Sequence, residues 1–346
     1  MAVPRVLFHC PSRRGLGHVM RSANLARAVQ DAAPGASVLV MLASEAAGRA
    51  CDGVPWVAAD PLSAPAWHDV AAAFAPTLAV FDTALPQPWA AAAIPRAFVW
   101  RAMVADRHAA TAADPRLRQM AAILVPHHAP EFRHAVPPEV LPRVTFAGPI
   151  VRGSDAEGQA RVRARYGLGP GDLVVVSTVG GGGFDDSAAW LLDLVFAAHR
   201  QWQPCLPRLR HIVVRGPLAA GRAPDAPAGL TLVDADPDLV HLFAIADLVV
   251  AEAGYNTVHE LRRLGVPALL APGIRAWDDQ AGRARALEAL GLARVVDRDR
   301  FDRALDALVT LGHDRQARDA MRRAAEAHPL DTGNRRAAEA LLRVAS

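Results

Sequence analysis

The hydrophobic positions of this chain follow two alternating patterns along most of its length. Short, nearly continuous apolar runs rich in valine and leucine alternate with longer stretches in which apolar residues recur at helical spacing. Continuous apolar runs are typical of strands buried on both faces of a parallel sheet. The alternation therefore predicts an α/β protein. The expected strands are 5–8, 37–42, 54–58, 78–81, 97–100 and 122–125 in the first half, and 173–177, 211–215, 230–233, 248–251, 268–271 and 293–296 in the second.

Two such units account for the length of the chain. Its 346 residues exceed one typical core and fit two domains. Segment 142–155 has glycine and proline where a linker needs them, so we place the boundary near Ile150. The tail from residue 301 onward predicts three helical stretches, of which the last, 334–344, has an apolar face. The predicted division is an N-terminal domain over 1–150, a second domain over 151–330 and a C-terminal helix over 331–346.

Each half opens with a strand that is followed by glycines, GLGH at 15–18 and GGGG at 180–183. In open parallel sheets, ligands bind beyond the carboxyl ends of the strands. Two such domains face to face would bring both loops to one interdomain cleft that holds donor and acceptor together. The first loop does not fit a dinucleotide fingerprint, because no glycine stands three places after Gly17 and no acidic residue ends the second strand.

Segment 251–272 predicts a strand, a glycine turn, a helix and a second strand. A helix that begins after Gly254 offers backbone N–H groups and the positive end of its dipole to an anion. Glu260 is unusual for a pure phosphate site, but it suits a nucleotide, whose ribose hydroxyls would donate hydrogen bonds to it. The alternative is an ordinary βαβ turn with a glutamate near its helix start, and this segment alone does not separate the two.

Composition narrows the chemistry. The chain has no lysine, so its 38 basic residues are arginines, set against 35 acidic residues. This excludes a Schiff-base lysine, a pyridoxal phosphate anchor and a P-loop lysine. A net charge of only +3 does not argue for nucleic acid as a partner. The three scattered cysteines suit neither a zinc cluster nor a disulfide framework, so we expect no metal and no cofactor.

The chain also shows no pattern of membrane insertion or export. No apolar run approaches the roughly 20 residues of a membrane span. The first residues lead directly into a strand, without the charge pattern of a signal peptide. We therefore expect a cytoplasmic protein.

Three motifs carry a resemblance to a known family. GYNTVHE at 254–260, followed by GVP at 265–267 and by Asp279 and Gln280, resembles the donor-binding signature of the inverting GT-B glycosyltransferases, which use nucleotide sugars. GLGHVMR at 15–21 is similar to the glycine loop and histidine of the bacterial N-acetylglucosaminyltransferases that complete the lipid-linked peptidoglycan precursor. The combination of GxGHxxR, VGGGG and GYNTxxE resembles a group of bacterial predicted glycosyltransferases. The resemblance implies a GT-B fold, with two Rossmann-like domains facing across a cleft and a C-terminal helix that crosses back to the N-terminal domain.

The resemblance implies a donor site in the second domain. Glu260 would hold the ribose 2′ and 3′ hydroxyls, which favours UDP over a deoxyribonucleotide. The diphosphate would lie on loop 180–183 and at the helix start 254–257, because glycine lets backbone amides approach closely. Asp279 and Gln280 would bind hydroxyls of the transferred sugar. The expected donor-binding residues are Gly180, Gly181, Gly182, Gly183, Gly254, Tyr255, Asn256, Thr257, Glu260, Asp279, Gln280, Arg152 and Arg283.

One residue departs from the family pattern. The histidine that often precedes the motif and touches phosphate is replaced here by Glu252. A carboxylate beside a diphosphate is repulsive, so either Glu252 points away or arginine rebuilds the contact. Arg152 and Arg283 are the candidates, because a guanidinium grips phosphate oxygens in a fork.

Glycosyl transfer also needs a base for the acceptor hydroxyl and stabilisation of the leaving diphosphate. We expect His18 to be the base and Asp82, at the end of a strand, to orient it. Local capping by His18 is the alternative. The further acceptor-side candidates are Gly15, Gly17, Arg21 and Arg101. His127 and His128 look like a metal pair, but adjacent histidines usually point apart and no carboxylate spacing supports a site.

Three functions of different classes follow from these patterns. The favoured one is a metal-independent inverting glycosyltransferase with a UDP-sugar donor. Its acceptor would be a small molecule or lipid-linked, and a lipid-linked acceptor would bring peripheral contact with the inner face of a membrane. The second is a nucleotide-sugar hydrolase or epimerase, because GxGHxxR also occurs in a nucleotide-sugar hydrolase of the pseudaminic-acid route. The third is a non-catalytic nucleotide-sugar-binding subunit, against which His18 argues.

Overall fold

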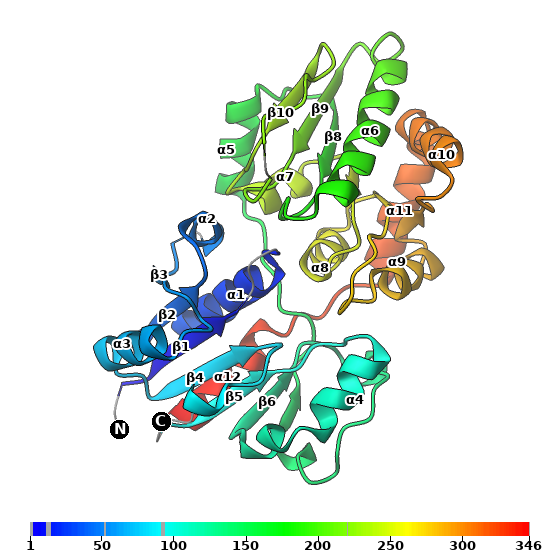
Figure 1. Cartoon of the computed structure of the whole chain (residues 1–346). Coiled ribbons are helices and arrows are strands. Elements are labelled where there is room, and N and C mark those ends of the chain that lie inside the picture. The colour runs from blue at the N-terminus through cyan, green and yellow to red at the C-terminus, as the bar shows by residue number, and fades with distance from the viewer. Residues whose placement is uncertain (1–2, 12–14, 52, 91–93, 220, 346) are drawn as a thin grey trace. The chain divides into compact units, whose positions relative to one another are not determined.

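Two parallel β-sheets form the framework of the chain (Figure 1). The computed structural model describes residues 3–11, 15–51, 53–90, 94–219 and 221–345. The chain divides into unit 1, Met1–Val151 with Ala276–Asp278 and Asp331–Ser346, and unit 2, Arg152–Arg275 with Asp279–Leu330. The predicted α/β class with two Rossmann-like sheets is confirmed.

Within its described residues, unit 1 has a seven-stranded sheet in the order β3-β2-β1-β4-β5-β6-β7, in which neighbouring strands are parallel. The strands are β1 Arg5–Cys10, β2 Ser37–Leu42, β3 Trp56–Ala58, β4 Leu78–Asp82, β5 Arg96–Val99, β6 Ala122–Val125 and β7 Val144–Phe146. The α-helices are α1 Gly17–Ala32, α2 Glu45–Gly48, α3 Ala64–Phe74, α4 Ala105–Ala113 and α12 Asn334–Ala345. Short 3₁₀ turns occur at η1 Arg49–Cys51, η2 Pro88–Ala90, η3 Pro115–Gln119, η4 Ala129–Glu131 and η5 Leu141–Arg143.

Strand β1 shows why its apolar run is unbroken. Val6 and Phe8 pack on the face that is covered by α1 and α12, whereas Leu7 packs with Trp67 and Phe81 on the opposite face. Burying such a side chain contributes about 1.5–3 kcal/mol. The apolar side of α12 packs against α1 in the same core, and Figure 1 shows α12 in red behind the sheet of unit 1. The predicted return of the C-terminal helix to the N-terminal unit is thereby confirmed.

The predicted linker 142–155 contains a strand that the sequence pattern did not reveal. Residues Val144–Phe146 form β7, which pairs with β6 at the edge of the sheet. Its three residues are only half-buried and follow Pro142, so they present neither a long apolar run nor a clear alternation. As the edge strand of the sheet, β7 pairs with a neighbouring strand on one side only, and it needs little apolar surface of its own.

Within its described residues, unit 2 has a six-stranded parallel sheet in the order β10-β9-β8-β11-β12-β13. Its strands are β8 Leu173–Thr178, β9 Leu209–Val214, β10 Leu230–Val233, β11 Leu248–Ala251, β12 Ala268–Leu270 and β13 Ala293–Val295. Its helices are α5 Ala156–Tyr166, α6 Asp185–Trp202, α7 Leu239–Ala244, α8 Tyr255–Leu264, α9 Gln280–Ala289, α10 Phe301–His313 and α11 Arg315–Ala327. One core joins α7, α8 and α9 to the sheet, and a second core joins α6 and α10 to its other face.

The two sheets share a topology that places their binding edges. In each sheet the chain runs outward from the central strand, β1 or β8, and then returns to its other side as β4 or β11. The strand order therefore reverses between β1 and β4 and between β8 and β11, and ligands of such sheets bind at the carboxyl ends beside this reversal. Among the described residues, no helix is long and apolar enough to cross a membrane.

Candidate active site

Loop 180–183 connects β8 to α6 at the reversal point of unit 2. The Gly181 carbonyl accepts a hydrogen bond from the Leu218 amide at 2.9 Å, so the loop packs on the connection that follows β9. Gly182 has a φ of +80°, and a Cβ atom there would lie 2.7 Å from the Arg215 carbonyl oxygen. A side chain is therefore excluded by the neighbouring backbone. The loop presents backbone rather than side chains, as a phosphate site requires.

Helix α8 begins one strand away, after β11. Gly254 precedes the helix without a side-chain cap, and the first turn of α8 has no acidic residue. Helix α6, in contrast, carries Asp185 and Asp186 in its first turn. The helix dipole at α8 is thus not offset by acidic side chains of its own first turn, which favours an anion there. Asn256 and Thr257 lie half-buried in this turn.

Glu260 is buried further along α8 and has an arginine partner. Its Oε1 accepts a hydrogen bond from Arg152 Nε at 3.2 Å, and Arg152 also donates to the Pro237 carbonyl. The structure thus places Arg152 on the carboxylate predicted to read ribose. Arg283 donates to the Ala253 carbonyl at 2.7 Å. Both arginines predicted to grip phosphate donate hydrogen bonds to protein groups, and their contact with phosphate stays a prediction.

Tyr255, Asp279 and Gln280 also make contacts within unit 2. The Tyr255 ring is buried and packs edge-on against the His259 ring, with 4.6 Å between the two ring centroids. Asp279 Oδ1 accepts a hydrogen bond from the Gly282 amide at 2.8 Å and so caps α9. Gln280 is buried, and its Oε1 accepts from the Gly273 amide at 2.8 Å. These bonds fix the connection between β12 and α9, and the expected contacts to sugar hydroxyls stay a prediction.

Glu252, the departure from the family pattern, is neutralised by arginine. It is 7% exposed, accepts a hydrogen bond from Ser187 Oγ at 2.5 Å and forms ion pairs with Arg275 and Arg298, the latter at 2.8 Å. The sequence pattern named Arg152 and Arg283 for this role. Arg275 and Arg298 stand 23 and 46 residues beyond Glu252, and no spacing signal marks them among the arginines of the chain.

In unit 1, His18 and Asp82 come into contact at the reversal point between β1 and β4. His18 lies in the first turn of α1, and Asp82 ends β4. His18 Nδ1 lies 3.2 Å from Asp82 Oδ1, and the imidazole is 25% exposed while the carboxylate is 1% exposed. A carboxylate accepts hydrogen bonds, so this contact suits the Nδ1–H tautomer of the imidazole, whose lone pair is on Nε2, while Arg21 Nη2 lies 3.4 Å from the same Nδ1.

Arg21 holds the carboxylate of this pair. Its Nε donates to Asp82 Oδ2 at 3.0 Å and its Nη2 donates to Oδ1 at 2.5 Å. Burial raises the pKa of Asp82, but the charges of Arg21 and His18 outweigh burial and hold that pKa well below its usual range. Thr83, which donates to Asp82 Oδ1, has a φ of +63°, a left-handed conformation that is strained for a β-branched residue. The site is therefore an ionised aspartate built into the fold.

Arg21 and Arg101 each pair with a carboxylate of unit 1. Arg21 is 1% exposed and bound to Asp82, and Arg101 is buried with its Nη1 donating to Asp278 Oδ1 at 2.6 Å. The expected contact of these arginines with acceptor or phosphate stays a prediction. Gly15 is half-buried before α1, whereas Gly17, the first residue of α1, is exposed and a Cβ on it would meet no atom within 4 Å.

The adjacent histidines do point to different partners. His127 Nε2 accepts from the Ala102 amide at 3.0 Å, and His128 Nε2 donates to the Asp331 carbonyl at 3.0 Å. Over the part of the chain that the structure describes, no group of three or more histidine, cysteine or acidic side chains is arranged to hold a metal.

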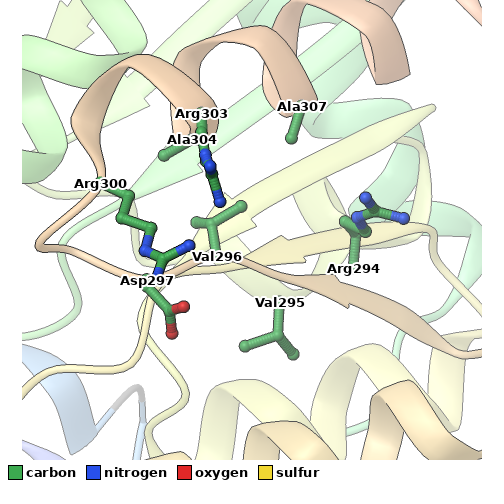
Figure 2. A pocket seen from close by; sticks show the side chains of 8 residues that line it. All are labelled: Arg294, Val295, Val296, Asp297, Arg300, Arg303, Ala304 and Ala307. Carbon is green, nitrogen blue, oxygen red and sulfur yellow. The ribbon is translucent and has the colours of Figure 1, made fainter.

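A surface hollow of about 150 Å³ lies between β13 and α10 in unit 2 (Figure 2). In Figure 2, Arg303 reaches from α10 toward Val296, and Arg300 lies beside Asp297. The lining residues are Arg294, Val295, Val296, Asp297, Arg300, Arg303, Ala304 and Ala307. None of them is a residue predicted to bind the donor.

Together the two sheets, the glycine loops and the C-terminal helix that returns to unit 1 define a GT-B fold. Spinosyn forosaminyltransferase SpnP shares this fold with a TM-score of 0.62 at 16% identity, over 100% of both chains. A candidate UDP-N-acetylglucosamine 2-epimerase from Listeria monocytogenes also shares it, with a TM-score of 0.59 at 12% identity over 98% of this chain and 94% of the other. At such identities the likeness shows the fold alone.

Sequence comparison adds a family match within the second half of the chain. Residues 229–338 match the glycosyltransferase family 28 C-terminal domain. A UDP-N-acetylglucosamine–N-acetylmuramyl-(pentapeptide) pyrophosphoryl-undecaprenol N-acetylglucosamine transferase from Serratia proteamaculans is 33% identical over 108 residues, which are 31% of this chain and 30% of that protein. The chain matches less than half the length of its curated relatives. It is therefore similar to these transferases in part of its length.

Proposed function

We propose that this protein is a metal-independent inverting glycosyltransferase that moves a sugar from a UDP-sugar to an acceptor hydroxyl. The observation that carries the proposal is the contact between His18 Nδ1 and the buried Asp82, from which we infer that Nε2 acts as the base. The family 28 match over residues 229–338 and the UDP-sugar named in the Serratia relative support the donor class.

The proposed reaction uses His18 as the base and UDP as the leaving group. His18 Nε2 takes the proton of the acceptor hydroxyl as its oxygen forms a bond to the anomeric carbon. The bond from that carbon to the β-phosphate oxygen breaks, and its electron pair leaves with UDP. Attack opposite the leaving group inverts the anomeric centre. Asp82 stabilises the imidazolium that forms, because its negative charge lies beside Nδ1.

Unit 2 supplies the donor site in this proposal. The diphosphate lies on the amides of loop 180–183 and on the α8 start, and Glu260 accepts hydrogen bonds from the ribose. Arg152 Nε donates to Glu260 Oε1 at 3.2 Å and so orients this carboxylate. Backbone dipoles and arginine provide the charge stabilisation for which other enzymes use a metal.

The names of the relatives indicate only the chemical class of the acceptor. The Serratia protein is named for an undecaprenol-linked acceptor. We propose a lipid-linked hydroxyl acceptor, which would bring this protein to the inner face of the membrane as a peripheral, cytoplasmic enzyme.

The test combines binding with product release. A thermal-shift series with UDP, GDP and dTDP should give the largest shift for UDP, because a ligand of the folded state raises the midpoint according to its affinity. UDP release from UDP-N-acetylglucosamine should then be slow alone and fast with a polyprenyl-diphosphate-linked amino sugar. Failure of the folded protein to bind any nucleoside diphosphate would overturn the proposal.

A hydrolase or epimerase is the second candidate, because the GxGHxxR pattern at 15–21 resembles that of a nucleotide-sugar hydrolase. Rapid UDP release in water without an acceptor would identify a hydrolase. Conversion of UDP-N-acetylglucosamine into a second UDP-sugar, detected by anion-exchange chromatography, would identify an epimerase. Binding of the donor with no reaction under any of these conditions would indicate a binding subunit.

A further inference from the structure

Glu252 lies at the junction of three strand ends in unit 2. It directly follows β11 and stands two residues before Gly254, where α8 begins. Ser187, which donates to it, lies in the first turn of α6 after loop 180–183, and Arg275 lies beyond the end of β12. Because β8, β11 and β12 are neighbours in the sheet, these three connections meet at one edge.

The two arginines on Glu252 are not equivalent, and Arg298 is the structural one. Its Nε donates to the Pro272 carbonyl, its Nη1 to the Ser187 carbonyl, and its Nη2 to both Glu252 and the Ala271 carbonyl. Four hydrogen bonds occupy most of its five N–H groups. Arg298 therefore closes the end of β12 and has little donor capacity left.

Arg275 has donor capacity to spare. Its Nη2 pairs with Glu252, and its Nη1 donates to Ile274 and Ser187 oxygens, at 3.0 Å and 3.4 Å. Its Nε has no hydrogen-bond partner among the residues that the structure describes. The guanidinium carbon lies 4.0 Å from the centroid of the Phe184 ring, and Phe184 directly follows loop 180–183. Stacking on an aromatic face fixes the plane of the group.

The charges of this cluster leave an excess of one positive charge. One carboxylate meets two guanidinium groups, so Glu252 neutralises only one of them. Asp185 and Asp186 also lie nearby in sequence, but both are exposed to solvent, which screens them. Of the two guanidinium groups, Arg275 is the one with an N–H group left to donate to an anion.

We propose that Arg275 is a diphosphate-binding residue of the donor site, held in place by Glu252 and by the Phe184 ring until the donor arrives. This inference rests on the proposed function and deepens it, because it names the side chain that compensates for the glutamate in place of the family's histidine. The Nε and an Nη group of Arg275 donate to phosphate oxygens. Stacking on the Phe184 ring fixes the orientation of the guanidinium plane. Arg298 stays on Glu252 and prevents that carboxylate from facing the diphosphate as an unpaired charge.

The test compares UDP with UMP, which lacks the β-phosphate, by titration calorimetry on the full-length protein. Arg275→Ala should reduce UDP affinity by about tenfold or more, since hydrogen bonds between charged groups are lost, and should reduce UMP affinity less. The preference for UDP over UMP therefore falls. Arg294→Ala removes the same charge from an exposed position of unit 2 and should leave the preference unchanged.

The outcomes separate this inference from the proposed function. Wild-type protein that binds neither nucleotide would overturn the proposed function, and the role of Arg275 with it. Wild-type protein that prefers UDP, together with an Arg275→Ala variant that keeps the full preference, would overturn the role of Arg275 alone. If Arg275→Ala loses its cooperative thermal transition, Arg275→Gln, which keeps a similar length, takes its place and should show the same loss of preference.

Discussion

Asp82 and Glu252 occupy equivalent places in the two sheets but have different surroundings. Asp82 ends β4, beside the central strand β1, and Glu252 follows β11, beside the central strand β8. In both units a residue from the helix after the central strand contacts the carboxylate, Arg21 from α1 and Ser187 from α6. The same position in the topology thus carries a buried acid twice.

The number of arginines separates the two sites. Asp82 has one arginine and a histidine, so its charge is balanced and the imidazole beside it can exchange a proton. Glu252 has two arginines and no histidine as partners among the residues that the structure describes, so its surroundings stay positive. The first arrangement suits proton transfer and the second suits an anion. The two sheets thus have the same topology, but the side chains that pair with the acid suit proton transfer in unit 1 and anion binding in unit 2.

The largest expected effect is on turnover, from His18→Ala. Loss of the base should lower the turnover number by about 10²- to 10⁴-fold, the usual contribution of general base catalysis. UDP affinity should not change, because the proposed contacts to the diphosphate and the ribose all come from unit 2. Turnover is followed by UDP release in the presence of acceptor, and binding by calorimetry. His68→Ala, at an exposed position of α3, is the control. Near-normal turnover of His18→Ala would show that the His18–Asp82 site does not carry out the proton transfer.

Asp82→Asn should cause the largest loss of stability. The buried guanidinium of Arg21 would lose its counter-charge, which costs about 3–5 kcal/mol in the free energy of unfolding. Urea unfolding measures this loss, with the exposed Asp69→Asn as control. An unchanged midpoint for Asp82→Asn would show that Arg21 has another partner in place of the carboxylate.

Glu252→Gln should cost less, about 2 kcal/mol, although it removes the partner of two arginines. The side chains of Arg275 and Arg298 are 13% and 18% exposed, so water solvates part of the charge that Glu252 leaves behind. The same urea experiment applies, and Glu157→Gln on the surface of α5 is the control. A loss larger than that of Asp82→Asn would reverse the order of the two sites.

The sequence predicted the sheets far better than the partners of these carboxylates. Strands such as β2 and β11 were predicted at their observed bounds, because a strand buried on both faces leaves an unbroken apolar run. β7 was missed because a half-buried edge strand leaves no such run. The contact between His18 and Asp82 was expected because both follow strand ends at one edge of a parallel sheet.

The arginine partners could not be predicted in the same way. Every basic residue of this chain is an arginine, so residue type does not distinguish Arg21, Arg275 or Arg298 from solvated surface positions. Ion pairs between residues 23 to 61 positions apart depend on the tertiary fold and not on local spacing. Glu252 was recognised as unusual, but only the structure shows which side chains neutralise it.

The smallest expected effect is a pH dependence that neither carboxylate causes. Burial lowers the pKa of His211 in unit 2 to about 3, whereas the pKa in the unfolded chain is near 6.5. Below pH 6.5 the unfolded chain therefore binds a proton that the folded protein does not, and stability falls as pH falls toward 3. Between pH 6.5 and 5.5 this single group should cost about 1 kcal/mol.

Asp82 acts in a lower pH range. Its pKa is lowered in the folded protein, so its contribution is present above the usual aspartate pKa and is lost only as pH falls through the lowered value. Unfolding free energies measured by urea at several pH values between 7 and 5 should therefore decline because of buried histidines, among which His9 and His108 also have lowered pKa values. His211→Gln should reduce the slope of unfolding free energy against pH by the contribution of one bound proton. The exposed His68→Gln should leave that slope unchanged. An equal slope in wild type and His211→Gln would mean that His211 is already protonated in the fold, and that the hydrogen bond between its Nε2 and Ser177 tolerates the charge.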